Sequence, residues 1–78
     1  MRRRTIEKAV GDDRFSIHAG AGYFYFRLDD GVSFVDSAIT GHSVYVPRLS
    51  DLSLDQWVAE ARDFIEVARA ECERQRKD

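Results

Sequence analysis

Apolar residues recur at every second position in two neighbouring stretches of the chain. They are Phe15, Ile17 and Ala19 in the first stretch and Phe24, Phe26 and Leu28 in the second. Successive side chains of a β-strand point to opposite faces, so this period of two predicts two strands, each with one apolar face. Gly20, Ala21 and Gly22 lie between the stretches and supply the permissive backbone of a turn, which predicts a hairpin.

A third short segment, from Ser43 to Val46, repeats the alternation. Val44 and Val46 fall on one side, and Ser43 and Tyr45 fall on the other. Pro47 follows directly, and proline ends a ladder because it has no N–H to donate. We therefore expect a third strand over residues 43–46.

The segment between these strands, from Asp29 to His42, has two interpretations. Asp29, Asp30 and Gly31 form a turn signal. The next eight residues, VSFVDSAI, fit either a strand or a helical turn. The strand would place Val32 and Phe34 on one side, whereas the helical turn would align Val32, Val35, Ala38 and Ile39. Valine and phenylalanine favour the strand, and both interpretations stay open.

The last third of the chain has the pattern of a long helix that begins at Ser53. Gln56 follows three residues later, which completes a capping box, and Leu52 and Trp57 occupy the positions of a hydrophobic staple. One apolar face then runs through Leu54, Trp57, Val58, Ala61, Phe64, Ile65, Ala68 and Cys72. Near the N-terminus, Ile6, Ala9 and Val10 precede Gly11 with helical spacing, which predicts a second, short helix.

Together these elements predict an α+β fold. We expect a three- or four-stranded antiparallel meander with the long C-terminal helix packed on one face, and a short N-terminal helix. This arrangement leaves the opposite face of the sheet bare. By alternation, the residues on that open face are His18, Tyr23, Tyr25, Arg27 and Tyr45. Tyrosine and arginine are common at binding interfaces, so this set is our candidate partner-binding site, with a solvated sheet surface as the alternative.

Composition and charge limit the class of protein. A chain of 78 residues with 44% apolar and 12% aromatic residues fits a single globular domain, residues 1–78. Its net charge of −2 gives no general attraction to nucleic acid or to an anionic membrane. Cys72 has no second cysteine to pair with, and no apolar run has the length of a signal segment or a membrane span. We expect a cytoplasmic protein.

The sequence contains no convincing catalytic or metal-binding motif. His18 and His42 lack the spacing and the cysteine partners of a zinc site. Asp36, Ser37 and His42 supply the residue types of a nucleophilic triad, but no nucleophile elbow surrounds the serine. The glycines of AGAG lack the lysine of a phosphate-binding loop. We therefore expect a protein that is not an enzyme and has no cofactor.

Two segments carry a resemblance to a known group of proteins. GYFYF, residues 22–26, and SVYVPRLSDLSLDQWV, residues 43–58, resemble a recurrent pattern in small uncharacterised proteins encoded by tailed phages and prophages. Pro47, where that pattern has an aromatic residue, and the longer segment from Asp29 to His42 are departures. The resemblance implies a phage accessory protein that binds and disables a host protein, such as a CRISPR effector or another defence complex. It supplies no catalytic residue.

The expected function is therefore the binding of a host protein or protein complex. One alternative is a nucleic-acid-binding module that stacks bases on the aromatic open face, with Arg14, Arg27 and Arg48 near the strands to meet phosphates. Another alternative is a homodimer or a larger assembly formed through an unpaired edge strand. We expect no membrane partner.

Overall fold

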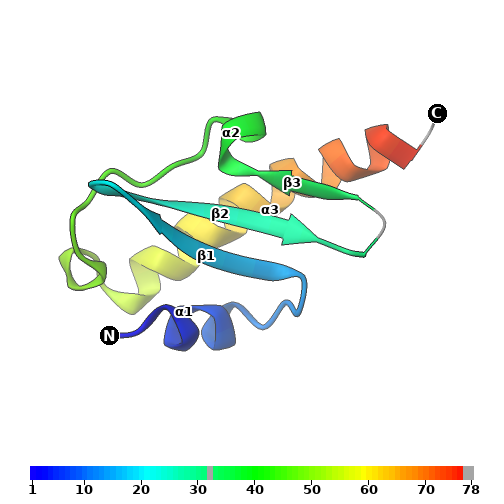
Figure 1. The fold of residues 1–78 in the computed structure, drawn as a ribbon. Coiled ribbons are helices and arrows are strands. Elements are labelled where there is room, and N and C mark those ends of the chain that lie inside the picture. Colours follow the sequence, from blue (N-terminus) through cyan, green and yellow to red (C-terminus); the bar gives the residue numbers. More distant parts are fainter. Residues whose placement is uncertain (32, 77–78) are drawn as a thin grey trace.

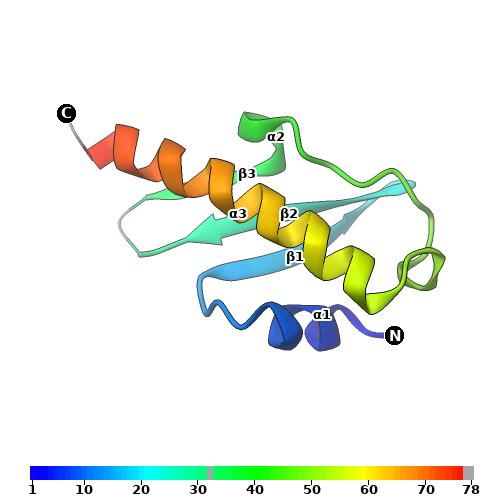
Figure 2. The same cartoon turned by 180° about the vertical axis from the view of Figure 1, so that it is seen from behind.

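The computed structural model describes residues 1–31 and 33–76. In chain order the elements are α1 (Arg3–Val10), β1 (Phe15–Gly20), β2 (Tyr23–Asp29), β3 (Phe34–Asp36), α2 (Ser37–Thr40), a 3₁₀ turn (Leu49–Asp51) and α3 (Leu54–Arg76). The strands form one antiparallel sheet in the order β1-β2-β3. Helix α3 runs diagonally across one face of this sheet, and α1 lies alongside β1 (Figures 1 and 2). The predicted α+β class, with both helices, is confirmed.

The core fills the space between α3 and the covered face of the sheet. Its buried apolar residues are Ile6, Phe15, Ile17, Phe24, Phe26, Leu28, Val35, Trp57, Ala61, Phe64, Ala68 and Cys72. Phe26 lies at the centre, where its ring centroid is 5.4 Å from that of Phe64 and 5.5 Å from that of Phe15. The indole of Trp57 meets Phe24 edge-on at 5.5 Å. These tilted and edge-on arrangements are the favourable ones for aromatic pairs, so the layer is well packed.

The start of α3 has the predicted capping box. Ser53 Oγ accepts the N–H of Gln56 at 3.2 Å, and Gln56 Oε1 accepts the N–H of Ser53 at 2.8 Å. Trp57 Nε1 also donates to the carbonyl of Leu49 at 2.7 Å. The 3₁₀ turn is therefore tied to the first turn of the helix, and this fixes where α3 crosses the sheet.

The predicted strand over residues 43–46 is wrong as a strand. β3 pairs with residues 27–29 of β2. Of residues 43–46, only Val44 pairs with β2, through a single bridge to Phe24 with N···O distances of 2.8 and 2.9 Å. Between them the chain leaves the sheet as α2. Ser37 fills the gap in the ladder, because its buried Oγ accepts the N–H of Phe26 at 2.8 Å. Ser37 thus supplies Phe26 with the acceptor that a longer third strand would otherwise provide.

Both interpretations of residues 32–40 are partly right. A short strand covers Phe34–Asp36, and a helical turn follows over Ser37–Thr40. Val32 lies outside the described residues. Ala19 lies opposite Phe24 and so on the covered face, as the alternation predicted, but it is exposed and does not join the core.

Candidate functional site

Strand register brings the predicted site residues to one face. His18 of β1 lies opposite Tyr25 of β2, Gly20 lies opposite Tyr23, and Arg27 lies opposite Asp36 of β3. Directly paired residues share a face, and the neighbours of these β2 residues, Phe24 and Phe26, point into the core. The open face is therefore the one opposite α3. The described structure has no helix on that side (Figure 1).

Four aromatic side chains form a continuous line on this face, which we call the aromatic row: His18, Tyr25, Tyr23 and Tyr45. The imidazole of His18 stacks on Tyr25 with centroids 5.2 Å apart and planes 21° apart. Tyr25 and Tyr23 follow at 6.1 Å, and Tyr23 and Tyr45 at 5.9 Å. Tyr45 is 79% exposed. All four rings of the row were predicted for this face, and the structure shows that they also touch one another in sequence.

The ring of Tyr23 packs over Gly20, a contact that the sequence analysis did not predict. A Cβ atom built on Gly20 would lie 2.3 Å from Tyr23 Cζ, so the ring occupies the space directly over this glycine. An aromatic side chain that covers a cross-strand glycine is a known way to stabilise the weak position in a sheet. Gly20 is therefore required here for a close approach, because the backbone itself is ordinary strand.

Arg27 lies on the open face but points away from the aromatic row. Its Nη2 is 3.2 Å from Asp29 Oδ2, and its guanidinium carbon lies 4.4 Å from the centroid of the Phe34 ring. Phe34 is 46% exposed at this end of the sheet. The predicted set therefore divides into the aromatic row and a separate cluster of Arg27, Asp29 and Phe34.

A serine–histidine pair on this face was missed by the sequence analysis. Ser16 Oγ and His18 Nε2 are 2.8 Å apart. The signal was present, since the two residues are two positions apart on one strand and so share a face. Catalysis by such a pair needs a third group on the other ring nitrogen and donors for an oxyanion. Among the described residues no hydrogen bond to Nδ1 of His18 is recorded. The pair orients the imidazole against Tyr25.

Asp36, Ser37 and His42, the residue types of a triad, are separated by the fold. Ser37 is buried and bonded to the backbone of β2. His42 Nε2 is 3.0 Å from Glu60 Oε2 of α3, and its ring lies 5.9 Å from Phe26 on the covered face. Within residues 1–31 and 33–76 the structure shows no group of three or more side chains that could hold a metal ion.

The aromatic row borders a hollow on the open face. Its lining residues are Tyr23, Tyr25, Asp36, Ser43 and Tyr45, and its volume is about 460 Å³. Three tyrosine rings and one carboxylate thus come from β2, from the end of β3 and from the segment that follows α2. The hollow depends on the return of the chain at Val44, because this bridge holds Ser43 and Tyr45 beside β2.

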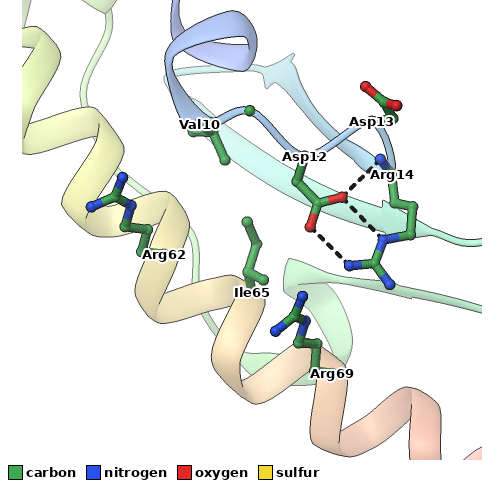
Figure 3. A pocket seen from close by; sticks show the side chains of 8 residues that line it. Val10, Asp12, Asp13, Arg14, Arg62, Ile65 and Arg69 are labelled. Atoms are coloured by element: carbon green, nitrogen blue, oxygen red, sulfur yellow. Dashed lines mark hydrogen bonds and ion pairs between the residues drawn. The ribbon is translucent and has the colours of Figure 1, made fainter.

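A second hollow lies between α3 and the loop from α1 to β1 (Figure 3). Arg14 donates to Asp12 through Nε at 3.0 Å and through Nη2 at 2.9 Å. The hydrogen bond from the Arg14 side chain is the main reason why the pKa of Asp12 lies below its ordinary value, and Arg69 adds a smaller electrostatic effect. Asp12 thus offsets the charge of Arg14, while Arg62 and Arg69 of α3 also line this hollow. The hydrogen bonds between Arg14 and Asp12 hold the loop before β1.

Comparisons of the chain with models of protein families, with curated proteins and with solved structures find no match. None of the helices in the described residues combines the length and the apolar character that a membrane span needs. The geometry of the open face is therefore the basis for the function proposed below.

Proposed function

We propose that this protein acts by binding another protein through the open face of its sheet. The observation that carries the proposal is the aromatic row, in which four rings lie in mutual contact on a face that no described helix covers. Tyrosine supplies a large, rigid contact area at a low entropy cost, together with a hydroxyl that tolerates water. Such residues dominate binding energy at protein interfaces.

The charges of the face favour a protein over a nucleic acid. A nucleic-acid surface needs cations that meet phosphates. Arg27 is paired with Asp29, and Asp36 lies opposite it in the register. Arg14 is bound to Asp12 in the loop that precedes β1 (Figure 3), whereas His18, Tyr23 and Tyr25 lie toward the hairpin end of β1 and β2. A nucleic acid whose bases stack on these rings would thus bring its phosphates beside Arg27, Asp29 and Asp36, which together carry one net negative charge.

The resemblance of GYFYF and SVYVPRLSDLSLDQWV to small phage proteins supports a more specific proposal. In this proposal the partner is a host protein in the bacterial cytoplasm, and binding inhibits a defence complex such as a CRISPR effector. The open face supports this only in its general form, as an exposed aromatic surface that a partner could contact. A second copy of the chain on the same face is the competing outcome, which sizing chromatography detects.

The test compares matched variants of the tagged protein in a bacterial lysate. A Tyr25→Ala and Tyr45→Ala double variant removes half of the aromatic row, and Val67→Ala removes an exposed apolar side chain from α3 as a control. A protein captured by the wild type is identified, purified and titrated by calorimetry. We expect the double variant to bind at least about tenfold more weakly, as the loss of interface anchors does, and the control to bind normally.

Two results would contradict the proposal. One is equal affinity of the folded double variant and the wild type for the purified partner. The other is a partner that proves to be nucleic acid, recognised by a steep fall of affinity with salt.

A further inference from the structure

The hollow between α3 and the loop that precedes β1 is lined by two arginines without an ionic partner (Figure 3). Arg62 and Arg69 lie seven residues apart on α3, so about two helical turns bring both to the same side of the helix. A glutamate follows each of them four residues later, which is the spacing of a surface ion pair. Among the described residues, neither arginine forms such a pair. Both side chains line the hollow instead.

The negative groups of the hollow offset these charges only in part. Both carboxylate oxygens of Asp12 accept hydrogen bonds from Arg14, and Arg69 acts on this carboxylate only through a smaller electrostatic effect. Asp13 is exposed, and its carboxylate points away from α3 in Figure 3. The C-terminal end of α1 adds at most about half a negative charge. Two guanidinium groups therefore leave the hollow attractive to an anion.

The size and the apolar part of the lining fit a small molecule. The volume of the hollow is about 560 Å³, which is within the range of sites for small organic ligands. Ile65 lies between the two arginines on α3, and Val10 faces it from the end of α1 (Figure 3). Both apolar residues are half-buried. A ligand with an anionic part and an organic part would meet a matching group for each.

We propose that this hollow binds the phosphate group of a small molecule. A phosphate monoester carries close to two negative charges at neutral pH, which matches the two unpaired guanidinium groups. Phosphate has three terminal oxygens and can engage both arginines, whereas the fork of one arginine occupies both oxygens of a carboxylate. The inference goes beyond the proposed function, because the site lies on the α3 side of the sheet and uses no residue of the aromatic row.

The site is probed with inorganic phosphate, with phenyl phosphate and with phenol as the neutral counterpart. The ¹⁵N-labelled protein is titrated at neutral pH and low ionic strength, because salt screens exposed charges. We expect saturable shifts of the side-chain Nε–H signals of Arg62 and Arg69 with both phosphates, at a Kd of about 1 to 10 mM. Phenol, and sodium chloride at the same ionic strength, should give no saturable shift.

The two phosphates also distinguish the source of the group. Tighter binding of phenyl phosphate supports an organic ester that uses Val10 and Ile65, and equal affinity supports the free phosphate ion. Either result supports a phosphate site.

Variants test the two arginines against a control on the same helix. Arg62→Gln and Arg69→Gln remove the charge and the fork, so each should weaken phosphate binding by about threefold or more. Arg74→Gln should bind normally, because Arg74 lies outside the hollow and pairs with Glu71. All three arginines are exposed, so the substitutions should leave the fold intact, which thermal unfolding followed by circular dichroism verifies.

The inference is overturned if neither phosphate gives saturable shifts, if phenol or chloride gives the same saturable shifts, or if both glutamine variants bind phosphate as the wild type does. These outcomes leave the proposed function standing, because capture of the protein partner is tested through Tyr25 and Tyr45.

Discussion

The two faces of β2 carry aromatic side chains at similar density but in different environments. Phe24 and Phe26 are 8% and 0% exposed, because α3 closes over them with Trp57 and Phe64. Tyr23 and Tyr25, their neighbours, pack only sideways, against each other and against His18 and Tyr45. The backbone is the same for both sets. The comparison teaches that the helix decides which rings stabilise the fold and which are left to contact something else.

The comparison predicts its largest difference between two adjacent residues of β2. Phe26→Ala removes a ring from the centre of the core and should lower the free energy of unfolding by about 3 to 5 kcal/mol. Tyr25→Ala loses only lateral contacts on the open face and should cost about 1 kcal/mol or less. Urea denaturation followed by circular dichroism measures both. Similar losses of unfolding free energy in the two variants would show that both faces stabilise the fold to a similar extent.

A smaller effect is expected from the serine that plugs the sheet. Ser37→Ala leaves the buried N–H of Phe26 without its acceptor, which should cost about 1 to 3 kcal/mol. Ser16→Ala on the open face is the matched control. Its hydroxyl bonds to His18 beside water, so its loss should hardly change the urea midpoint. If Ser37→Ala is as stable as this control, another group or water serves Phe26.

Whether the sequence predicts a feature depends on how far apart in the chain its interacting residues lie. The hairpin, the capping box of Ser53 and Gln56, and the positions of His18, Tyr23 and Tyr25 on the open face follow from periods and spacings within a few residues. The placement of residues 34–44 does not, because the bridge of Val44 to Phe24 and the bond of Ser37 to Phe26 join segments that are far apart in sequence. The same is true of the hollow, whose lining combines Asp36, Ser43 and Tyr45 with β2.

An ion pair at the rim of the covered face should contribute less than the packing inside it. Asp12→Asn removes the carboxylate charge that pairs with Arg14. We expect the free energy of unfolding to fall by about 0.5 to 1 kcal/mol at neutral pH, since exposed pairs contribute little. The pKa of Asp12 is lowered from its ordinary value of 3.8, chiefly by the hydrogen bond from Arg14. The stabilisation is therefore fully present above pH 3.8 and is lost as the pH falls through the lower pKa of the folded state.

Unfolding of the wild type and of Asp12→Asn is compared at several pH values. The difference between them should be constant at neutral pH and shrink in acid, and high salt should reduce it. Asp13→Asn, exposed and one residue further along, should match the wild type throughout. A difference that grows in acid would reverse the sign and exclude the Asp12 and Arg14 pair as its source.

The smallest effect on stability, and the sharpest separation of the two faces, is expected from Gly20→Ala. The backbone of Gly20 is ordinary strand, so alanine fits its dihedral angles, but its Cβ would lie 2.3 Å from the ring of Tyr23 and displace it. Because Tyr23 packs only on the open face, Gly20→Ala should change the free energy of unfolding by no more than about 0.5 kcal/mol. The melting temperature should therefore shift only slightly. The aromatic row should break at Tyr23, and the partner captured by the wild type should bind at least about threefold more weakly. In a Tyr23→Ala background the same substitution should have no further effect on binding, which a double-mutant cycle measures. A large loss of stability in Gly20→Ala would instead place Tyr23 among the residues that hold the fold together, and the division between a folding face and a binding face would fail at its central ring.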